Sequence, residues 1–330
     1  MVAIAVVIPC YRVRNTVLGV IARIGADVSR IYCVDDACPE QSGAHIADHC
    51  TDPRVIVLRN PENRGVGGAM TEGYRQALVD GMEIVVKIDG DGQMAPELLP
   101  VLVRPLLAGE ADYAKGNRFH SPRDLKTMPI IRLLGNACLS FFTKVSCGYW
   151  NIFDPTNGYT AIHRAALAQI PLDRVAPRYF FESDMLFNLN IIRAVVTDIP
   201  MAAHYNGEVS SLRIRRVVPQ FIAGNLRNLA RRIFYNYFLR DFNVASVELA
   251  AGLLLLIVGT AFGATTWIAN ARAGIVSSAG TVMLAGLPVI VGFQMLLAFL
   301  NFDVQSVPRT PIQRAWPRPA QPAQPSLPAG

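Results

Sequence analysis

The chain has 330 residues and a formal charge of +6 at neutral pH, with 52% hydrophobic and only 17% charged residues. This length allows one large domain or two smaller ones with a sizeable core. The composition is too apolar for an ordinary soluble enzyme, so it directs attention to segments that cross a membrane.

The N-terminal stretch MVAIAVVIPCYR has no basic region, and its apolar run before Pro9 is short. It does not resemble a signal peptide, so we expect residues 1 to about 240 to stay in the cytoplasm. The six cysteines form no CxxC pair, and Cys33 and Cys38 are spaced wrongly for a zinc ribbon. Reduced, partly buried thiols are the expectation.

Short apolar, β-branched runs recur along the first 90 residues, and they predict buried strands: AIAVVIP, IYCVDD, VIVLRN and EIVVKID. Segments of helical composition lie between them. One of these is AMTEGYRQALVDG, which ends on Gly81 as a helix C-terminus would. This alternation predicts an α/β fold with a mostly parallel sheet covered on both faces.

Acidic residues and glycines follow the ends of these strands. The first strand is followed by Pro9 to Arg12, the second by Asp35-Asp36, the third by the glycine-rich segment 60–70, and the fourth by DGDGQ at 89–93. Ligands of such sheets bind at the carboxyl ends of the strands. Apolar packing does not account for polar residues gathered at one edge, so we expect a site there.

The segment DGDGQ suggests a metal site. In an extended segment Asp89, Asp91 and Gln93 would point the same way, while Gly90 and Gly92 would leave room for a ligand. Carboxylate and amide oxygens suit Mg²⁺ or Mn²⁺, with water and substrate phosphates completing the coordination shell. The alternative is a plain turn, because Asp and Gly both favour turns.

The glycines of NRGVGGAM do not spell a dinucleotide fingerprint. Gly65, Gly67 and Gly68 have the wrong spacing for GxGxxG, and they follow the third strand rather than the first. Two interpretations remain. The glycines permit close packing of a helix N-terminus, or the free N–H groups of that helix face an anionic ligand.

Seven segments in this order resemble a family 2 glycosyltransferase with the GT-A fold, and within it the polyprenyl-phosphate sugar synthases, the group that contains dolichyl-phosphate mannose synthase. They are VVIPCYR, VDDAC, NRGVGGAM, KIDGDGQMAPE, GNRF, DPTNGYTAIHR and FESDML, and they extend from residue 4 to about 190. Two departures affect the nucleotide pocket. Arg12-Val13 replace the usual Asn-Glu, and Asp36-Ala37-Cys38 replace the usual Asp-Gly-Ser. The base of the donor therefore stays open.

The resemblance implies roles for particular residues. The nucleotide-sugar side would be formed by Pro9, Tyr11, Asp35, Asp36, Gly67, Asp89 and Gly90. The metal on the diphosphate would be Mg²⁺ or Mn²⁺, held by Asp89, Asp91 and Gln93. Phosphate charge would meet Arg118, and the sugar and acceptor side would include Asp154, Glu182 and Asp184. The catalytic set consists of these four residues and Asp91. The QxxRW motif of processive synthases is missing, since Gln220 is followed by Phe-Ile-Ala-Gly.

Residues 211–243 predict a basic amphipathic helix. Seven arginines and no acids lie between Ser211 and Arg240, and Ile222, Leu226, Leu229 and Ile233 recur at helical spacing. Nucleic acid is the rival partner for such a stretch. Its position just before apolar spans favours a membrane surface instead, and we expect no nucleic acid.

Two uncharged runs, Leu249–Ile268 and Ile275–Leu300, are each long enough to cross a bilayer, and two buried core helices are the alternative. Only Arg272 lies between them, so the positive-inside bias places both ends in the cytoplasm. We expect a GT-A domain over 1–210, interface helices over 211–243, two transmembrane helices over 244–302 and a disordered proline-rich tail over 303–330.

These features predict a membrane-anchored enzyme. It would move a hexose from a nucleoside-diphosphate sugar to a polyprenyl phosphate at the cytoplasmic face of the cell membrane. Two alternatives stay open: transfer to a protein or glycan, and an inactive transferase fold that serves as a membrane scaffold. The sequence leaves the sugar, the base of the donor and any homo-oligomer undetermined.

Overall fold

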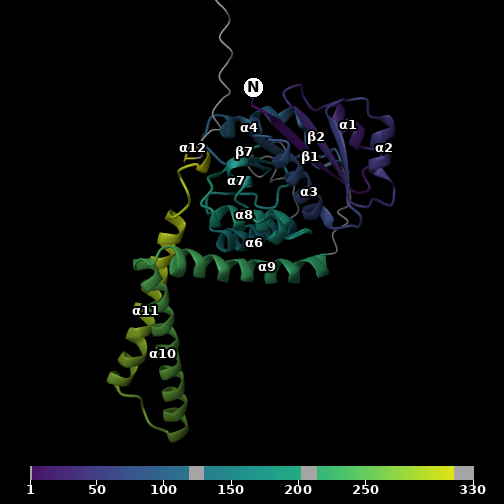
Figure 1. The fold of residues 1–330 in the computed structure, drawn as a ribbon. Helices are drawn as coiled ribbons and strands as arrows, with labels where there is room; N and C mark the ends of the chain where they lie inside the picture. Colours follow the sequence, from purple (N-terminus) through teal and green to yellow (C-terminus); the bar gives the residue numbers. More distant parts are fainter. Residues whose placement is uncertain (1, 119–129, 202–213, 316–330) are drawn as a thin grey trace, which may run out of the picture.

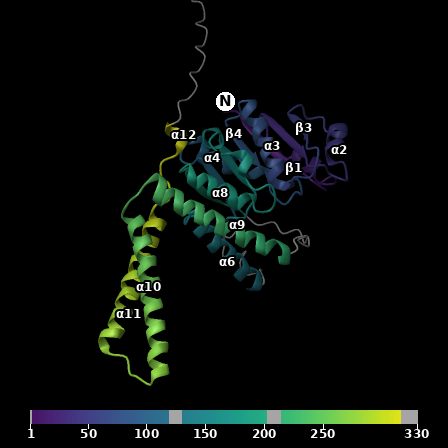
Figure 2. The ribbon, with the colours of Figure 1, turned by 60° about the horizontal axis from the view of Figure 1, so that its bottom comes forward.

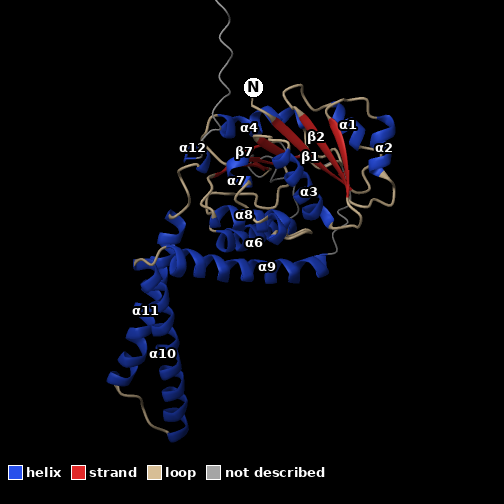
Figure 3. Cartoon of the chain, viewed as in Figure 1, coloured by secondary structure: helices blue, strands red, loops and turns tan. Residues whose placement is uncertain are grey.

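The computed structural model describes residues 2–118, 130–201 and 214–315. Its strands form one seven-stranded sheet in the order β3-β2-β1-β4-β6-β5-β7 (Figure 3). Only β6 runs antiparallel to its neighbours, so the expected mostly parallel sheet is confirmed. The strands are β1 Ile4–Cys10, β2 Arg30–Asp35, β3 Val55–Arg59, β4 Ile84–Lys87, β5 Tyr113–Asn117, β6 Thr160–His163 and β7 Val196–Pro200.

Helices cover both faces of this sheet. Alternate residues of β1 point to opposite sides, with Val7 in one core and Val6 in the other. The first core is shared with α3 (Gly65–Val79), α7 (Arg164–Leu167) and α8 (Phe181–Ile191). The second core is shared with α1 (Val17–Ala22), α2 (Ser42–His49) and α4 (Leu99–Leu107). The carboxyl ends of the parallel strands thus meet at one edge of a three-layer domain.

Helix α6 (Ile130–Cys147) and helix α9 (Ile214–Phe234) lie together on the side of the domain from which the C-terminal hairpin extends (Figures 1 and 2). A π-helix, Tyr235–Arg240, follows α9 and leads into α10 (Val244–Ala273). The predicted boundary at 244 therefore coincides with the first residue of α10. After α10 the chain turns back in α11 (Ala279–Gln305).

The hairpin of α10 and α11 extends away from the domain (Figure 1). Both helices are long and apolar enough to cross a membrane, and only 22% and 11% of their most apolar windows are buried. That exposure argues against two core helices. The helices approach closely where they carry small residues: a Cβ added at Gly252 would lie 3.0 Å from the carbonyl oxygen of Gly292.

The C-terminal segment returns to the domain. Helix α12 (Ile312–Ala315) lies beside α7, and the backbone N–H groups of Ile312 and Gln313 donate to the buried carboxylate of Asp112 at 2.9 and 3.0 Å. The expected disordered tail therefore does not begin at 303, because tertiary hydrogen bonds fix the chain up to 315. Residues 316–330 lie outside the described residues.

Candidate active site

A buried lysine organises the edge of the sheet beyond β4. Lys87 is the last residue of β4 and is 1% exposed. Its Nζ lies 2.8 Å from Oδ1 of Asp89 and 3.3 Å from Oε1 of Glu182, which lies in the first turn of α8. Burial alone would lower the pKa of Lys87, but the charges of Asp89 and Glu182 outweigh burial and raise it. The ammonium group therefore stays charged and ties β4 to α8.

Gly158 makes this arrangement possible. A Cβ at that position would stand 2.4 Å from Lys87 Nζ and 3.0 Å from Asp89 Oδ2, so any larger residue would displace the ion pair. Thr160 pairs with Lys87 on β4 and with Lys115 on β5, so two buried lysines flank one threonine across three strands.

Lys115 is in a different electrostatic state. Burial lowers its pKa to about 8, although Asp154 and Glu182 oppose the shift. Its Nζ donates to the carbonyl oxygen of Asn157. On the neighbouring strand β7, burial raises the pKa of Asp198 to about 6. The two residues are paired in register on adjacent strands, and burial shifts both pKa values toward neutrality without removing either charge at pH 7.

Asp91 and Gln93 lie in a turn, not in an extended segment. The backbone N–H of Gln93 donates to Oδ1 of Asp91 at 3.0 Å, and Gly92 has a φ of +81°. The expected extended segment over 89–93 is therefore wrong. Asp89, Asp91 and Gln93 do not share a direction by strand alternation, because that alternation does not continue through a left-handed glycine. Their role at a metal stays a prediction.

The donor set still suits a hard divalent cation. Asp89 and Asp91 supply two carboxylates just beyond β4, and one oxygen of Asp89 is taken by Lys87. The part of the chain that the structure describes has no group of three or more His, Cys, Asp or Glu placed to hold a metal. A Mg²⁺ or Mn²⁺ ion here would therefore depend on substrate phosphate and water for the rest of its ligands.

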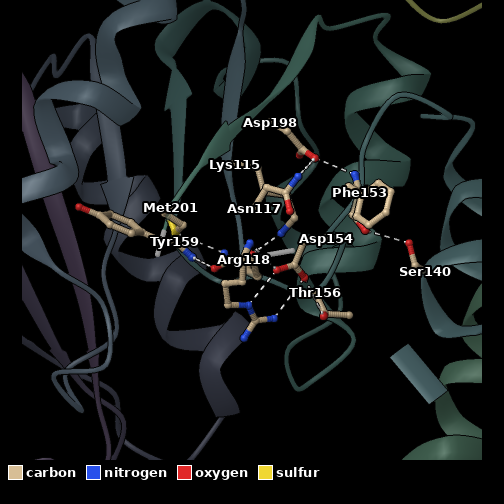
Figure 4. A network of polar contacts seen from close by, with 11 residues as sticks. Lys115, Asn117, Arg118, Ser140, Phe153, Asp154, Thr156, Tyr159, Asp198 and Met201 are labelled. Carbon is tan, nitrogen blue, oxygen red and sulfur yellow. Dashed lines mark hydrogen bonds and ion pairs between the residues drawn. The ribbon is translucent and has the colours of Figure 1, made fainter. Parts of the chain in front are cut away.

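Arg118 and Asp154 form a second pair, at the end of β5 (Figure 4). The Nε and Nη2 groups of Arg118 donate to the two oxygens of Asp154 at 2.8 and 3.1 Å. Asp154 is fully buried, whereas the side chain of Arg118 is 34% exposed. The carboxylate thus orients the guanidinium from below and leaves part of it accessible.

The same network includes the strand β7. Asp198 Oδ2 accepts from the backbone N–H of Phe153 at 2.7 Å and from the side chain of Asn117 at 3.1 Å (Figure 4). Phe153 directly precedes Asp154, so these contacts fix the loop that carries the partner of Arg118. Sequence reasoning included Arg118 and Asp154 but missed Asn117 and Asp198.

The predicted nucleoside pocket has an exposed aromatic ring. Tyr11 follows β1, is 42% exposed, and has the guanidinium of Arg12 5.5 Å from its ring centroid. Pro9 lies near the end of β1 and is half-buried. The carbonyl oxygen of Gly90 accepts from Oγ1 of Thr16 at 2.6 Å, which joins the DGDGQ turn to the start of α1.

Asp35 and Asp36 direct their carboxylates to the protein itself. Asp35 accepts from the backbone N–H groups of Cys38 and Gly43 at 2.8 and 2.7 Å. Asp36 is 2% exposed, and its carboxylate accepts from the Asn60 side chain and from the N–H groups of Arg64 and Gly65 at 2.7 to 3.0 Å. These contacts support a positioning role for both aspartates, which hold the loops around the predicted pocket.

Gly67 lies at a packing contact. A Cβ there would stand 2.3 Å from the carbonyl oxygen of Ala176, and the N–H of the next residue, Gly68, donates to Pro177. Of the two interpretations left open for these glycines, close packing of the N-terminus of α3 is the one that these contacts support.

Glu182 and Asp184 point in different directions. Asp184 is 2% exposed and accepts from the N–H of Ala176 and from the Asn228 side chain on α9, each at 2.8 Å. We therefore assign Asp184 to the contact between α8 and α9 and do not retain it in the proposed sugar side. Glu182 lies on a different side of α8, where it pairs with Lys87, and we retain it in the proposed site.

Ala37 has a left-handed backbone conformation that is strained for alanine. It stands where the resembled family has glycine, is exposed, and has a φ of +50°. We expect Ala37→Gly to raise the free energy of unfolding by about 0.5 to 1 kcal/mol. The left-handed region costs an L-residue about 1 to 2 kcal/mol, and the larger conformational entropy that glycine loses on folding offsets part of the relief. Urea denaturation measures the change.

The control for Ala37→Gly is Ala108→Gly. Ala108 is also exposed but has a φ of −75°, so the same substitution there should lower stability. A loss of stability at both positions would contradict the assignment of strain to Ala37.

A mostly parallel sheet between two helical layers, with carboxylates and cations at the ends of β4 and β5, defines an α/β domain of the GT-A type. The chain belongs to glycosyl transferase family 2, whose profile matches residues 5–170. It is therefore a glycosyltransferase by family and an enzyme by class.

Relatives with assigned names share this region. The chain is 33% identical over 162 residues to UDP-N-acetylglucosamine--dolichyl-phosphate N-acetylglucosaminyltransferase of Methanococcus voltae, which covers 46% of the chain and 64% of that relative's length. It is 30% identical over 202 residues to polyprenol monophosphomannose synthase of Mycolicibacterium smegmatis, covering 59% and 75%. Less than two thirds of the Methanococcus protein is thus matched.

A solved structure confirms the fold alone. Glucosyl-3-phosphoglycerate synthase from Mycobacterium tuberculosis, in complex with uridine-diphosphate, aligns with a TM-score of 0.53 and 21% identity over 69% of this chain and 80% of that one.

Proposed function

We propose that this chain transfers a hexose from a nucleoside-diphosphate sugar to a polyprenyl phosphate at a membrane surface. The relatives named for transfer to dolichyl phosphate and for synthesis of polyprenol monophosphomannose support this substrate class. The observation that carries the proposal is the apolar surface that α9 exposes directly below the catalytic domain.

Helix α9 buries polar residues and exposes apolar ones, with exposed arginines beside them. Asn225, Asn228 and Arg232 are 4%, 1% and 2% exposed and face the domain. On the other side Ile222 and Leu226 are 52% and 59% exposed. Exposed apolar side chains beside arginines are typical of a helix that lies at a membrane surface.

The neighbouring surface extends this apolar face. Phe141 and Phe142 on α6 are each 57% exposed, and α6 packs beside α9 (Figure 2). Leu229 and Ile233, which the sequence predicts on the same apolar face, are half-buried instead. Arg232, counted among the basic residues of this segment, is buried, so it does not contribute to a charged membrane surface.

The proposed reaction forms a bond from a phosphate oxygen of the acceptor to the anomeric carbon and breaks the bond from that carbon to the nucleoside diphosphate. A phosphomonoester has a second pKa near 6, so it is largely dianionic at neutral pH and needs no strong base. A bound Mg²⁺ or Mn²⁺ would neutralise charge on the departing diphosphate. Asp89 and Asp91 would hold that ion, and Lys87 would keep Asp89 and Glu182 in place.

Arg118 is the residue that we assign to phosphate. Arg118→Lys keeps one positive charge but loses the planar fork that contacts both oxygens of Asp154. We expect transfer to fall about 10- to 100-fold, since charged hydrogen bonds contribute about 1.5 to 3 kcal/mol. Steady-state kinetics with each substrate varied in turn measure the effect, and a thermal melt tests the fold.

The control for Arg118→Lys is Arg23→Lys, which changes an exposed ion pair with Glu97. Wild-type kinetic constants for both substrates in Arg118→Lys would return Arg118 to the class of ordinary surface arginines.

The experiment that tests the proposal is a screen of nucleotide sugars with a polyprenyl phosphate and Mn²⁺ or Mg²⁺, read as sugar in the lipid fraction. Label in protein or glycan instead would favour the first alternative, and absence of nucleotide-sugar binding would favour the inactive scaffold.

We place the catalytic domain and both ends of the hairpin in the cytoplasm. Val276, between the two apolar helices, is 92% exposed, and Val79, at the end of α3 in the catalytic domain, is 80% exposed. In a chain that carries Cys138→Ser, a maleimide that cannot cross membranes should label Val276→Cys in intact cells and Val79→Cys only after permeabilisation. Labelling of Val79→Cys in intact cells would refute this orientation.

A further inference from the structure

One buried carboxylate joins the hairpin to the catalytic domain. Asp303 lies in the last turn of α11 and is 2% exposed. The Nη1 and Nη2 groups of Arg232 on α9 donate to its two oxygens at 2.5 and 3.0 Å. Tyr237 of the π-helix donates its hydroxyl at 2.6 Å, and Trp150 donates its indole N–H at 2.9 Å. Four separate segments thus meet at one side chain, and we call these four residues the Asp303 cluster.

Neighbouring contacts are built around this cluster. Gly148 has a φ of +75°, and a Cβ there would stand 2.6 Å from Nη1 of Arg232. The ring of Tyr237 packs edge-on against Phe299 of α11 at 5.0 Å, and its carbonyl oxygen accepts from Ser246 of α10. Tyr237 therefore contacts both helices of the hairpin. The π-helix is a wider turn of a kind often found at functional positions.

The cluster also continues toward the candidate active site. Trp150 begins the loop 150–154, whose last residue is Asp154, the carboxylate that orients Arg118. Within this loop Asn151 donates to the carbonyl oxygen of Val196, and the N–H of Phe153 donates to Asp198. The end of α11 and Arg118 are thus connected through the five consecutive residues 150–154.

We infer that Asp303 is a positioning residue, which fixes the catalytic domain at one height and tilt above the bilayer so that Arg118 meets the phosphate of a membrane-embedded acceptor. This inference rests on the proposed function for its choice of acceptor. A phosphate at the headgroup level of a lipid cannot move to follow a displaced site, whereas a soluble acceptor can. A misplacement of about 1 Å already lowers rates by up to about 10²-fold.

The test uses the full chain in vesicles of phosphatidylcholine and phosphatidylglycerol. The double variant Arg232→Met/Asp303→Leu removes the whole ion pair, because an apolar replacement of a buried pair is usually tolerated while one unpaired charge is not. Tyr237→Phe is the second variant, which removes one hydroxyl donor to Asp303 and keeps the aromatic ring. The matched control is Arg54→Met/Asp52→Leu, which removes an ion pair just before β3, the outer strand of the sheet.

The first measurement is energy transfer from a fluorophore on the catalytic domain to a dye-labelled lipid. Val79→Cys, 80% exposed at the end of α3, carries the fluorophore, and Cys138→Ser removes the exposed native thiol. We expect the Arg232/Asp303 variant to change the transfer efficiency and broaden the distance distribution, and the Arg54/Asp52 control to match the parent. Unchanged efficiency in the variant would overturn the inference, and this arm needs no substrate.

The second measurement compares a long-chain polyprenyl phosphate in the bilayer with a short, water-soluble prenyl phosphate. We expect the Arg232/Asp303 variant to lose about tenfold or more with the long acceptor, Tyr237→Phe to lose less, and both to keep their rates with the short one. Equal losses on both acceptors would overturn the inference. Failure of the unmodified chain on both acceptors would instead contradict the proposed function, which the fluorescence arm does not depend on.

Discussion

Asp91→Asn should abolish sugar transfer while the protein stays folded. The substitution keeps the size of the side chain and removes one of two carboxylates at the end of β4, where the other, Asp89, already shares an oxygen with Lys87. An amide oxygen is a much weaker ligand for a hard cation, so we expect a loss of about 10³-fold or more in turnover. Asp91 is only half-buried, so the free energy of unfolding should change by less than about 0.5 kcal/mol.

Two measurements separate the metal from the fold. Calorimetric titration of a nucleoside diphosphate with Mn²⁺ should show the loss of metal-dependent binding, and a urea melt should overlay the parent. Asp27→Asn is the control, since Asp27 is exposed and lies before the amino end of β2, whereas the site lies at the carboxyl ends of the strands. Turnover of Asp91→Asn near that of the parent would remove Asp91 from the metal site.

The strands and the edge that carries the site follow from local sequence. Runs such as IAVVIPC and IVVK are apolar on both sides because helices cover both faces of the sheet, so their composition alone identifies them. Residues that follow such runs must then share one edge, and this predicts Asp89 there, whereas Arg118 and Asp154 are predicted from the family resemblance.

The contacts of Lys87 could not be predicted in that way. A lysine at the end of an apolar run carries no sign of burial, and its partner Glu182 is nearly a hundred residues further along the chain. The split between Glu182 and Asp184 was within reach, however. In a helix two residues apart differ by about 200° around the axis, so assigning FESDML to a helix separates them. The docking of 307–315 depends on Asp112, which is distant in sequence and leaves no local signal.

Lys87→Met should cause the largest loss of stability among the substitutions considered. Methionine fills a similar volume but leaves Asp89 and Glu182 facing each other without the ammonium between them. Removal of one partner from a buried ion pair costs about 3 to 5 kcal/mol, and urea denaturation should detect that loss directly. Lys115→Met is the contrasting variant, because burial has already brought the pKa of Lys115 down to about 8 and its Nζ donates to a carbonyl oxygen. We expect a cost there of about 1 to 3 kcal/mol, that of one unsatisfied acceptor.

A second substitution identifies the charge as the cause. Lys87→Met/Glu182→Gln removes one positive and one negative charge together, so it should recover most of the stability that Lys87→Met loses. Its transfer activity should stay low, because Asp89 lacks its ion pair with Lys87 in both the double and the single variant. Glu182→Gln alone fixes how much of that activity loss belongs to Glu182. If Lys87→Met and Lys115→Met prove equally stable, or if Glu182→Gln restores nothing, packing rather than charge holds Lys87 in place, and Asp89 is positioned by the DGDGQ turn.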